Sequence, residues 1–355
     1  MVEEKRVIQN YAKWLGKRPF EPLEIEIKPT NNCNLNCMSC RVMGNLEYDP
    51  NEEIGHRAYT DSLKELGTSG LKVHITGGGE PFAYPGITGL VSALAQSGIS
   101  SSVTTNGTLI TGEQIDIMVS HRWRHIFFSL DAPDAETHDK LRGKKGTFER
   151  VVSTIEKINE KKKALKSDLP SIELGLVLSE YNADAIGDYI DMGIRLHVKN
   201  ITLQPLRVEV RDNFGLTLSD ETRKRFMGRL AGLRMKCDEH NIISNLGHFD
   251  DMLIGKTRGI TKVIESYTRD KLPIHCFHPW FFMSVHPNGD IFPCSFKLDE
   301  PFGNIGRNSL KATWESAPFE LFRKRFHEGG LPPFCNMCCG TNITVMKDIR
   351  EQYEN

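Results

Sequence analysis

The nine cysteines are the residues of this chain whose type and spacing could bind a metal. Six of them stand in two short groups near opposite ends of the chain, namely Cys33, Cys37 and Cys40, and Cys335, Cys338 and Cys339. An odd count excludes complete internal disulfide pairing. The N-terminus has no apolar stretch of the signal-peptide kind, so we expect a cytoplasmic protein, in which cysteines bind metal or remain thiols.

The first group has the spacing C-x3-C-x2-C and stands in a polar loop directly after a predicted strand at 23–28. Three thiolates can bind three corners of a cubic iron–sulfur cluster and leave the fourth iron open to another ligand, whereas a closed structural zinc site uses four protein ligands. A zinc site with a distant fourth ligand, or buried thiols, would be the alternatives. The three-ligand count favours an open cluster.

The second set has four members and therefore predicts a closed metal site. Its cysteines are Cys276, Cys294, Cys335 and Cys338. An iron–sulfur cluster and a zinc ribbon both fit four cysteines that end in C-x2-C. Cys339 adjoins the set and could replace Cys338. Cys237 falls on the apolar stripe of a helix predicted at 218–241, which is typical of a buried core thiol.

Strands and helices alternate along the first part of the chain. Period-two and short apolar patterns predict strands at 23–28, 71–76, 101–105, 125–130, 172–178 and 201–206. Helical patterns stand between them at 50–67, 86–97, 111–120, 148–163 and 183–192. This alternation predicts a parallel sheet, either doubly wound or a barrel. Beyond about residue 270, proline, glycine and aromatic residues become dense, and a turn at 286–290 predicts a second, small unit.

The C-x3-C-x2-C loop resembles that of the radical S-adenosylmethionine superfamily. In that family the loop follows the first strand of a partial (β/α)6 barrel, and the open iron of its [4Fe-4S] cluster binds the amino and carboxylate groups of S-adenosylmethionine. The reduced cluster cleaves this ligand to a 5′-deoxyadenosyl radical, which abstracts a substrate hydrogen. The resemblance also implies a reductase, a flavodoxin or a ferredoxin as electron donor.

A second family mark is the strip Gly77-Gly78-Gly79-Glu80-Pro81 after the second predicted strand. Glycines let a backbone approach a ligand closely, and Glu80 can hold the local geometry. Arg142 stands where relatives carry an arginine that pairs with the ligand carboxylate, but Ser39 replaces the aromatic residue that often touches adenine. The resemblance implies contacts to S-adenosylmethionine from Gly78, Gly79, Glu80, Pro81, Asn106, Ser129, Asp131, Arg142 and Gln204.

The region 276–338 resembles the SPASM domain, and more closely its truncated twitch form, with a pattern similar to the butirosin-pathway aminocyclitol dehydrogenase. It implies a second, auxiliary [4Fe-4S] cluster on the four-cysteine set. The expected fold is α/β, with a partial (β/α)6 TIM-like barrel followed by a small cysteine-rich α+β domain. The predicted divisions are an N-terminal extension at 1–22, the barrel at 23–217, a helical bridge at 218–269 and the auxiliary domain at 270–355.

The fate of the substrate radical separates three hypotheses. Oxidation through the auxiliary cluster would make a dehydrogenase of a small molecule such as a sugar or aminocyclitol. Hydrogen return from a spare thiol, Cys237 or Cys339, would make an epimerase. The third is maturation of a ribosomal peptide. Because 22 residues precede the first strand, too few for the leader-binding domain that many peptide-modifying relatives carry, a small molecule is expected.

Charge and hydropathy exclude other classes. Lys and Arg number 45 against 46 Asp and Glu, so a chain-wide electrostatic grip on nucleic acid or on an acidic membrane is not expected. The sequence contains no run of 18 consecutive apolar residues, so no membrane span is predicted. The non-catalytic alternative is a zinc-binding interaction module, and the glycine strip disfavours it.

Overall fold

The computed structural model describes residues 4–40, 49–67, 70–206, 214–249, 276–295 and 300–330, and one sheet runs through them. Its strands are β1 (Glu24–Ile27), β2 (Lys72–Ile75), β3 (Ser100–Thr105), β4 (His125–Ser129), β5 (Ser171–Leu178), β6 (Asn200–Pro205), β7 (Ile243–Ser244), β8 (Phe282–Val285), β9 (Asp290–Phe292) and β10 (Gly303–Asn304). Their order in the sheet is β10-β9-β8-β1-β2-β3-β4-β5-β6-β7. The pairs from β8 through β1 to β7 are parallel, and those of β9 with β8 and β10 are antiparallel.

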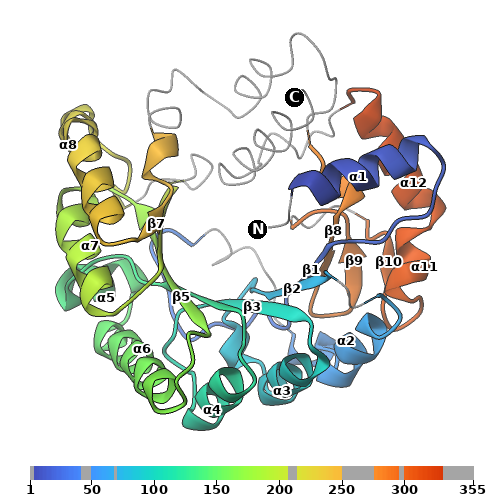
Figure 1. Ribbon diagram of the computed structural model, residues 1–355, viewed down its shortest axis with the longest axis horizontal. Helices are drawn as coiled ribbons and strands as arrows, with labels where there is room; N and C mark the ends of the chain where they lie inside the picture. Colours follow the sequence, from blue (N-terminus) through green and yellow to red (C-terminus); the bar gives the residue numbers. More distant parts are fainter. Residues whose placement is uncertain are drawn as a thin grey trace.

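Helices follow most of the parallel strands and lie outside the curved sheet (Figure 1). They are α1 (Glu4–Leu15), α2 (His56–Leu63), α3 (Ile87–Ser97), α4 (Gly112–Ser120), α5 (Ala135–Arg142), α6 (Thr147–Ala164), α7 (Ile186–Arg195), α8 (Asp220–Glu239), α11 (Leu310–Trp314) and α12 (Ala317–His327). Short 3-10 turns are η1 (Pro50–Glu52), η2 (Pro81–Ala83), η3 (Ala183–Ala185), η4 (Leu246–His248) and η5 (His278–Trp280). The predicted α/β fold with a partial barrel is confirmed. Among the described helices, none is long and apolar enough to cross a membrane.

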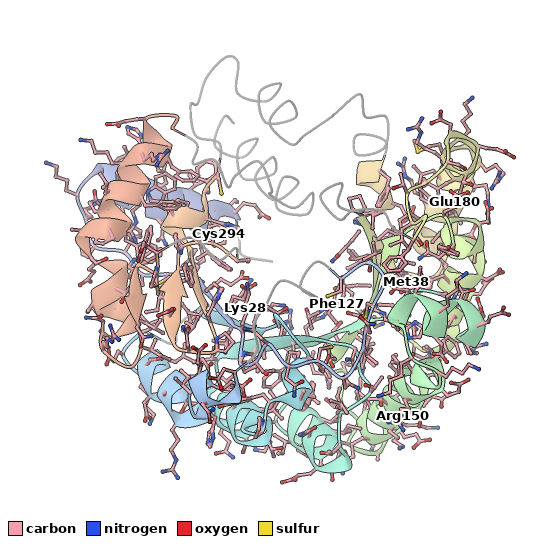
Figure 2. All side chains as sticks on the ribbon, turned by 180° about the vertical axis from the view of Figure 1, so that it is seen from behind. Lys28, Met38, Phe127, Arg150, Glu180 and Cys294 are labelled. Atoms are coloured by element: carbon pink, nitrogen blue, oxygen red, sulfur yellow. The ribbon has the colours of Figure 1, made fainter. Side chains whose placement is uncertain are left out.

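The two faces of the sheet differ because successive side chains of a strand point to opposite faces. Residues such as Ile25, Ile126 and Leu174 are fully buried and pack against the outer helices. Figure 2 shows side chains filling this layer, with Arg150 of α6 on its outer side.

The opposite, inner face carries polar side chains that bond to one another across strands. Nδ1 of His74 lies 2.7 Å from Oγ of Ser102, and Nε2 of His125 lies 2.9 Å from Oε2 of Glu173. The hydroxyl of Thr202 also donates to Glu173. The alternation seen in the sequence therefore divides an apolar outer layer from a polar barrel interior.

The predicted strands agree with the observed ones to within a few residues, and so do most helices, although the helix predicted at 50–67 is shorter, at His56–Leu63. Ser219 caps α8 by accepting a hydrogen bond from the backbone N–H of Thr222. Sequence patterns missed α5, the N-terminal helix α1 and the C-terminal helices α11 and α12. The buried face of α1 packs on the C-terminal part of the chain, where the rings of Tyr11 and Trp280 meet edge to face at 5.1 Å.

The C-terminal part also joins the barrel sheet directly, which the sequence did not indicate. Strand β8 pairs in parallel with β1, with Glu24 opposite Phe282, and the predicted turn at 286–290 connects β8 to the antiparallel β9. The sheet therefore continues from the barrel into the small C-terminal unit. The predicted divisions at residues 218 and 270 remain a prediction.

The outer layer provides a stability test. Leu174 is fully buried in β5, so Leu174→Ala should lower the free energy of unfolding by about 2–5 kcal/mol through lost contacts and a residual cavity. Ile243, on the edge strand β7, is 72% exposed, and Ile243→Ala should change the free energy of unfolding by less than about 0.5 kcal/mol. Urea denaturation of both variants measures the difference. Equal losses would contradict the assignment of Leu174 to the core.

Candidate active site

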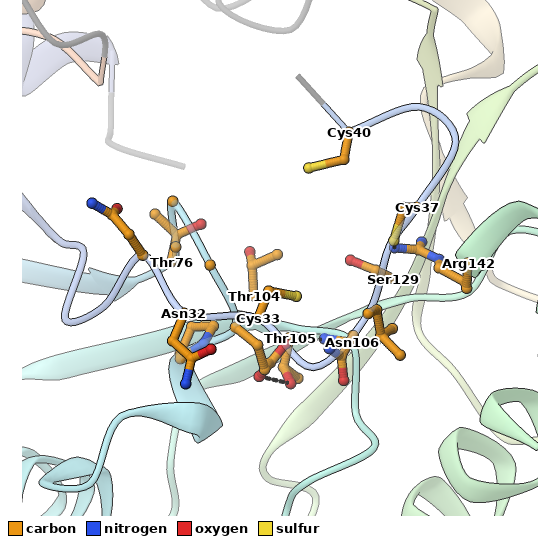
Figure 3. A pocket seen from close by; sticks show the side chains of 17 residues that line it. Asn32, Cys33, Cys37, Cys40, Thr76, Thr104, Thr105, Asn106, Ser129 and Arg142 are labelled. Carbon is orange, nitrogen blue, oxygen red and sulfur yellow. Dashed lines mark hydrogen bonds between the residues drawn. The ribbon is translucent and has the colours of Figure 1, made fainter. Parts of the chain in front are cut away.

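A cavity of about 470 Å³ opens at the carboxyl ends of β2, β3 and β4, where the parallel strands of α/β folds commonly bind ligands. The cysteine loop covers one side and the glycine strip another (Figure 3). The lining residues are Asn31, Asn32, Cys33, Leu35, Cys37, Cys40, Thr76, Gly77, Gly78, Gly79, Glu80, Pro81, Thr104, Thr105, Asn106, Ser129 and Arg142. Most of the predicted ligand contacts are therefore gathered around one space.

Cys33, Cys37 and Cys40 all line this cavity as half-buried free thiols (Figure 3). Burial raises the pKa of the Cys33 thiol to about 11 and also raises the pKa of Cys37, so a metal cluster could bind these two thiols only with release of their protons. In the described part of the chain, no three Cys, His, Asp or Glu side chains lie close enough to hold a single metal ion. Three thiols spaced around a cavity fit a larger cluster with one open iron.

The glycine strip packs directly against the segment that leads into the cysteine loop. The backbone N–H of Gly79 donates to the carbonyl of Thr30, and that of Glu80 donates to the carbonyl of Asn32 at 2.7 Å. A Cβ atom on Gly79 would lie 1.9 Å from the carbonyl oxygen of Asn32, which no side chain permits. Gly79 is thus needed for contact between two chain segments, in addition to its predicted approach to the ligand.

Glu80 is 3% exposed, and its carboxylate accepts three hydrogen bonds from the protein. The donors are the hydroxyl of Thr105 at 2.6 Å, the backbone N–H of Asn106 at 2.7 Å and the backbone N–H of Phe82 at 3.1 Å. Burial raises the pKa of Glu80 even though these bonds favour the charged form. Glu80 borders the cavity and holds the strip to the end of β3.

Arg142 borders the cavity, but its guanidinium already has a protein partner. Its Nε lies 2.8 Å from Oδ2 of Asp131, a residue that is 2% exposed. Burial by itself lowers the pKa of Arg142, but Asp131 and Cys37 outweigh it, so this pKa is raised overall. Asp131 and Gln204 are not among the described residues that line the cavity. Asp131 lies behind Arg142, where it can act on a ligand through that side chain.

The remaining predicted residues fall elsewhere or outside the described residues. Cys237 is fully buried in the outer hydrophobic core with Phe226 and Leu233, and burial raises the pKa of its thiol. A hydrogen donor must reach the substrate, so this position does not support that role for Cys237. Cys276 and Cys294 are half-buried. Cys335, Cys338 and Cys339 lie outside the described residues.

Sequence reasoning missed several polar residues that line the cavity, among them Asn32, Thr76 and Thr104. Thr76 and Thr104 stand at the carboxyl ends of β2 and β3, and Asn32 directly precedes Cys33. Their position at the end of a predicted strand, or a few residues after it, is the signal that could have identified them, because parallel strands end at one edge.

The fold and the site define an S-adenosylmethionine-dependent iron–sulfur enzyme, and comparison with known proteins gives its family. Residues 27–176 match the radical SAM superfamily, and residues 276–339 match the SPASM iron-sulfur cluster-binding domain. An AdoMet-dependent heme synthase of Nitratidesulfovibrio vulgaris is 32% identical over 83% of this chain and 79% of its own. The chain belongs to the radical SAM superfamily, and its cofactors are S-adenosylmethionine and [4Fe-4S] clusters.

Two further proteins are similar over most of the chain. A PqqA peptide cyclase of Rhizobium meliloti is 24% identical over 90% of this chain and 80% of its own. The crystal structure of Streptococcus suis SuiB bound to the precursor peptide SuiA has the same fold, with a TM-score of 0.65 and 19% identity. The superposition covers 97% of this chain and 77% of SuiB.

The contact between Gly143 and the cysteine loop gives a test of the site. Gly143 has φ +69°, and a Cβ there would lie 2.2 Å from the carbonyl oxygen of Asn36, so Gly143→Ala should displace the loop and reduce the iron bound after reconstitution. Gly146 has φ +77° with open space around it, so Gly146→Ala carries the same backbone strain without the clash. Iron analysis and visible absorbance compare the two. Equal iron in both would contradict the docking of the loop on Gly143.

Proposed function

We propose that this enzyme oxidatively modifies a peptide by radical chemistry at the cavity. The observation that carries the proposal is the similarity to a peptide cyclase over 90% of this chain, which extends beyond the cluster-binding motifs. The shared fold with SuiB, seen with its precursor peptide, is consistent with it. This favours the peptide hypothesis over the small-molecule dehydrogenase expected from the sequence.

When bound, the first cluster and S-adenosylmethionine supply a radical that removes a substrate hydrogen. The auxiliary cluster supplies a route by which one further electron leaves the substrate. The chain itself holds and orients them. Cys33, Cys37 and Cys40 are the proposed ligands of the first cluster, and Asn106 and Ser129 line the cavity where the ligand would lie. The proposed auxiliary ligands remain Cys276, Cys294, Cys335 and Cys338.

The polar interior of the barrel suits a substrate that brings amide groups to the cavity. Thr104 lines the cavity, and its hydroxyl lies 3.0 Å from Nε2 of His74, which connects the cavity to the polar inner face. Hydroxyl and imidazole groups can donate to and accept from peptide amides. A reductase, flavodoxin or ferredoxin is the proposed source of the electron for the first cluster.

A second candidate substrate is a porphyrin, because the heme synthase is more identical to this chain than the peptide cyclase is. Oxidation of a sugar or aminocyclitol, and epimerisation with Cys339 as donor, remain further proposals with less support. The burial of Cys237 removes the structural basis for its use as the donor.

Deuterium transfer distinguishes the substrate classes. Reconstituted enzyme with S-adenosylmethionine and a reductant is given a deuterated peptide pool, a deuterated iron porphyrin or a deuterated aminocyclitol, in separate reactions. Mass spectrometry of 5′-deoxyadenosine should detect deuterium with the peptide pool, because the 5′-deoxyadenosyl radical takes its hydrogen from the substrate. Deuterium from the porphyrin alone, or from the aminocyclitol alone, would overturn the peptide proposal.

A cysteine substitution controls for background cleavage. Cys33→Ala removes a proposed cluster ligand, so it should abolish 5′-deoxyadenosine formation with every substrate, whereas Cys237→Ala should retain it because that thiol lies in the core. Liquid chromatography of the product measures both. Full activity in Cys33→Ala would contradict the assignment of the cluster to this loop.

A further inference from the structure

Arg142, at the C-terminal end of α5, contacts a carboxylate through one nitrogen and a cluster cysteine through another. Its Nε lies 2.8 Å from Oδ2 of Asp131, and its Nη1 donates to Sγ of Cys37 at 3.7 Å. Figure 3 shows the guanidinium beside the Cys37 side chain. The Arg142 side chain is 12% exposed and that of Asp131 2%, so water screens these charges less than at the surface.

Asp131 is itself held from two sides, which fixes the direction of the guanidinium. Its Oδ1 accepts a hydrogen bond from the backbone N–H of Val177 at 3.1 Å, and its backbone carbonyl accepts one from Nδ2 of Asn182 at 2.8 Å. Its backbone N–H donates to Nδ1 of His138 on α5. The carboxylate is therefore a fixed anchor for Arg142.

The cysteine loop is docked on the same helix end. The backbone N–H groups of Asn36 and Met38, on either side of Cys37, donate to the carbonyls of Arg142 and Leu141 at 3.3 and 2.9 Å. Backbone bonds on both sides of Cys37 set its distance from the guanidinium. The contact thus follows from the docking of the loop together with the anchoring of the Arg142 guanidinium by Asp131.

We propose that Arg142 is a positioning residue that sets the reduction potential of the cluster bound through Cys37. A reduced cluster carries one more negative charge than an oxidised one, so a buried cation that donates to a sulfur ligand stabilises the reduced form. Asp131 offsets part of that positive charge. The two residues therefore act on the potential in opposite directions. This role is separate from the contact to the ligand carboxylate that the family resemblance implies.

Potentiometric titration of the reconstituted enzyme, followed by electron paramagnetic resonance without S-adenosylmethionine, tests the proposal. The midpoint potential of the first cluster should become more negative in Arg142→Met, because a cation and a donor to sulfur are lost. It should fall less in Arg142→Lys, which keeps the charge, and it should rise in Asp131→Asn. Arg225 forms an exposed pair with Asp184 at 2.8 Å, and Arg225→Met should leave the midpoint unchanged.

Iron content is measured first, and equilibrium binding of S-adenosylmethionine is measured in each variant. An unchanged midpoint in Arg142→Met, with weaker binding of S-adenosylmethionine, would show that Arg142 acts on the ligand alone and would overturn the proposal. Shifts of the same sign in Arg142→Met and Asp131→Asn would indicate a general disturbance and would also overturn it. If Arg142→Met does not hold a cluster, the midpoint potential of Asp131→Asn decides whether the proposal stands, because only a rise of that potential is compatible with it.

Discussion

The buried carboxylate of Glu80 is the contact on which the geometry of the site depends. Its oxygens accept from Thr105 and Asn106 at the end of β3, and its own backbone N–H donates to Asn32, directly before Cys33. Burying a charged carboxylate without hydrogen-bond donors costs on the order of several kcal/mol in lost hydration. The donors around Glu80 are therefore required for its burial. One residue thereby joins the glycine strip to a strand end through its side chain and to the cysteine loop through its backbone.

The division of the sheet into an apolar and a polar face explains why the site lies inside the barrel. Aliphatic residues of each strand bury against the outer helices, and the alternate positions must then face the interior. There His74, His125 and Glu173 bond to neighbouring hydroxyl groups and to each other, so the interior has few polar atoms to desolvate without a partner. The barrel interior therefore offers hydrogen-bonding side chains next to the cavity that the cysteine loop borders.

The barrel and the C-terminal unit share a buried polar seam beside β1. Glu26 accepts from the hydroxyl groups of Ser284 and Ser295, and Nζ of Lys28 donates to the backbone carbonyl of Ser295, next to Cys294. Burial alone would raise the pKa of Glu26, but Lys28 and the hydroxyl donors lower it, so the carboxylate is charged at neutral pH. The segment that follows β9 is thus held to the first strand of the barrel by charge as well as by the pairing of β8 with β1.

The sequence by itself determined the secondary structure of the barrel and the position of the chemistry. Side-chain periodicity depends on residues two to four positions apart, so strands such as 125–130 and helices such as 148–163 were predictable, as were the cysteine loop and the core position of Cys237. Only the tertiary structure decided the pairing of Glu24 with Phe282, the three donors to Glu80 and the placement of Asp131 behind Arg142. Most of these contacts join residues far apart in the chain. A local sequence pattern does not specify which distant backbone donor or strand edge a residue contacts in the folded state.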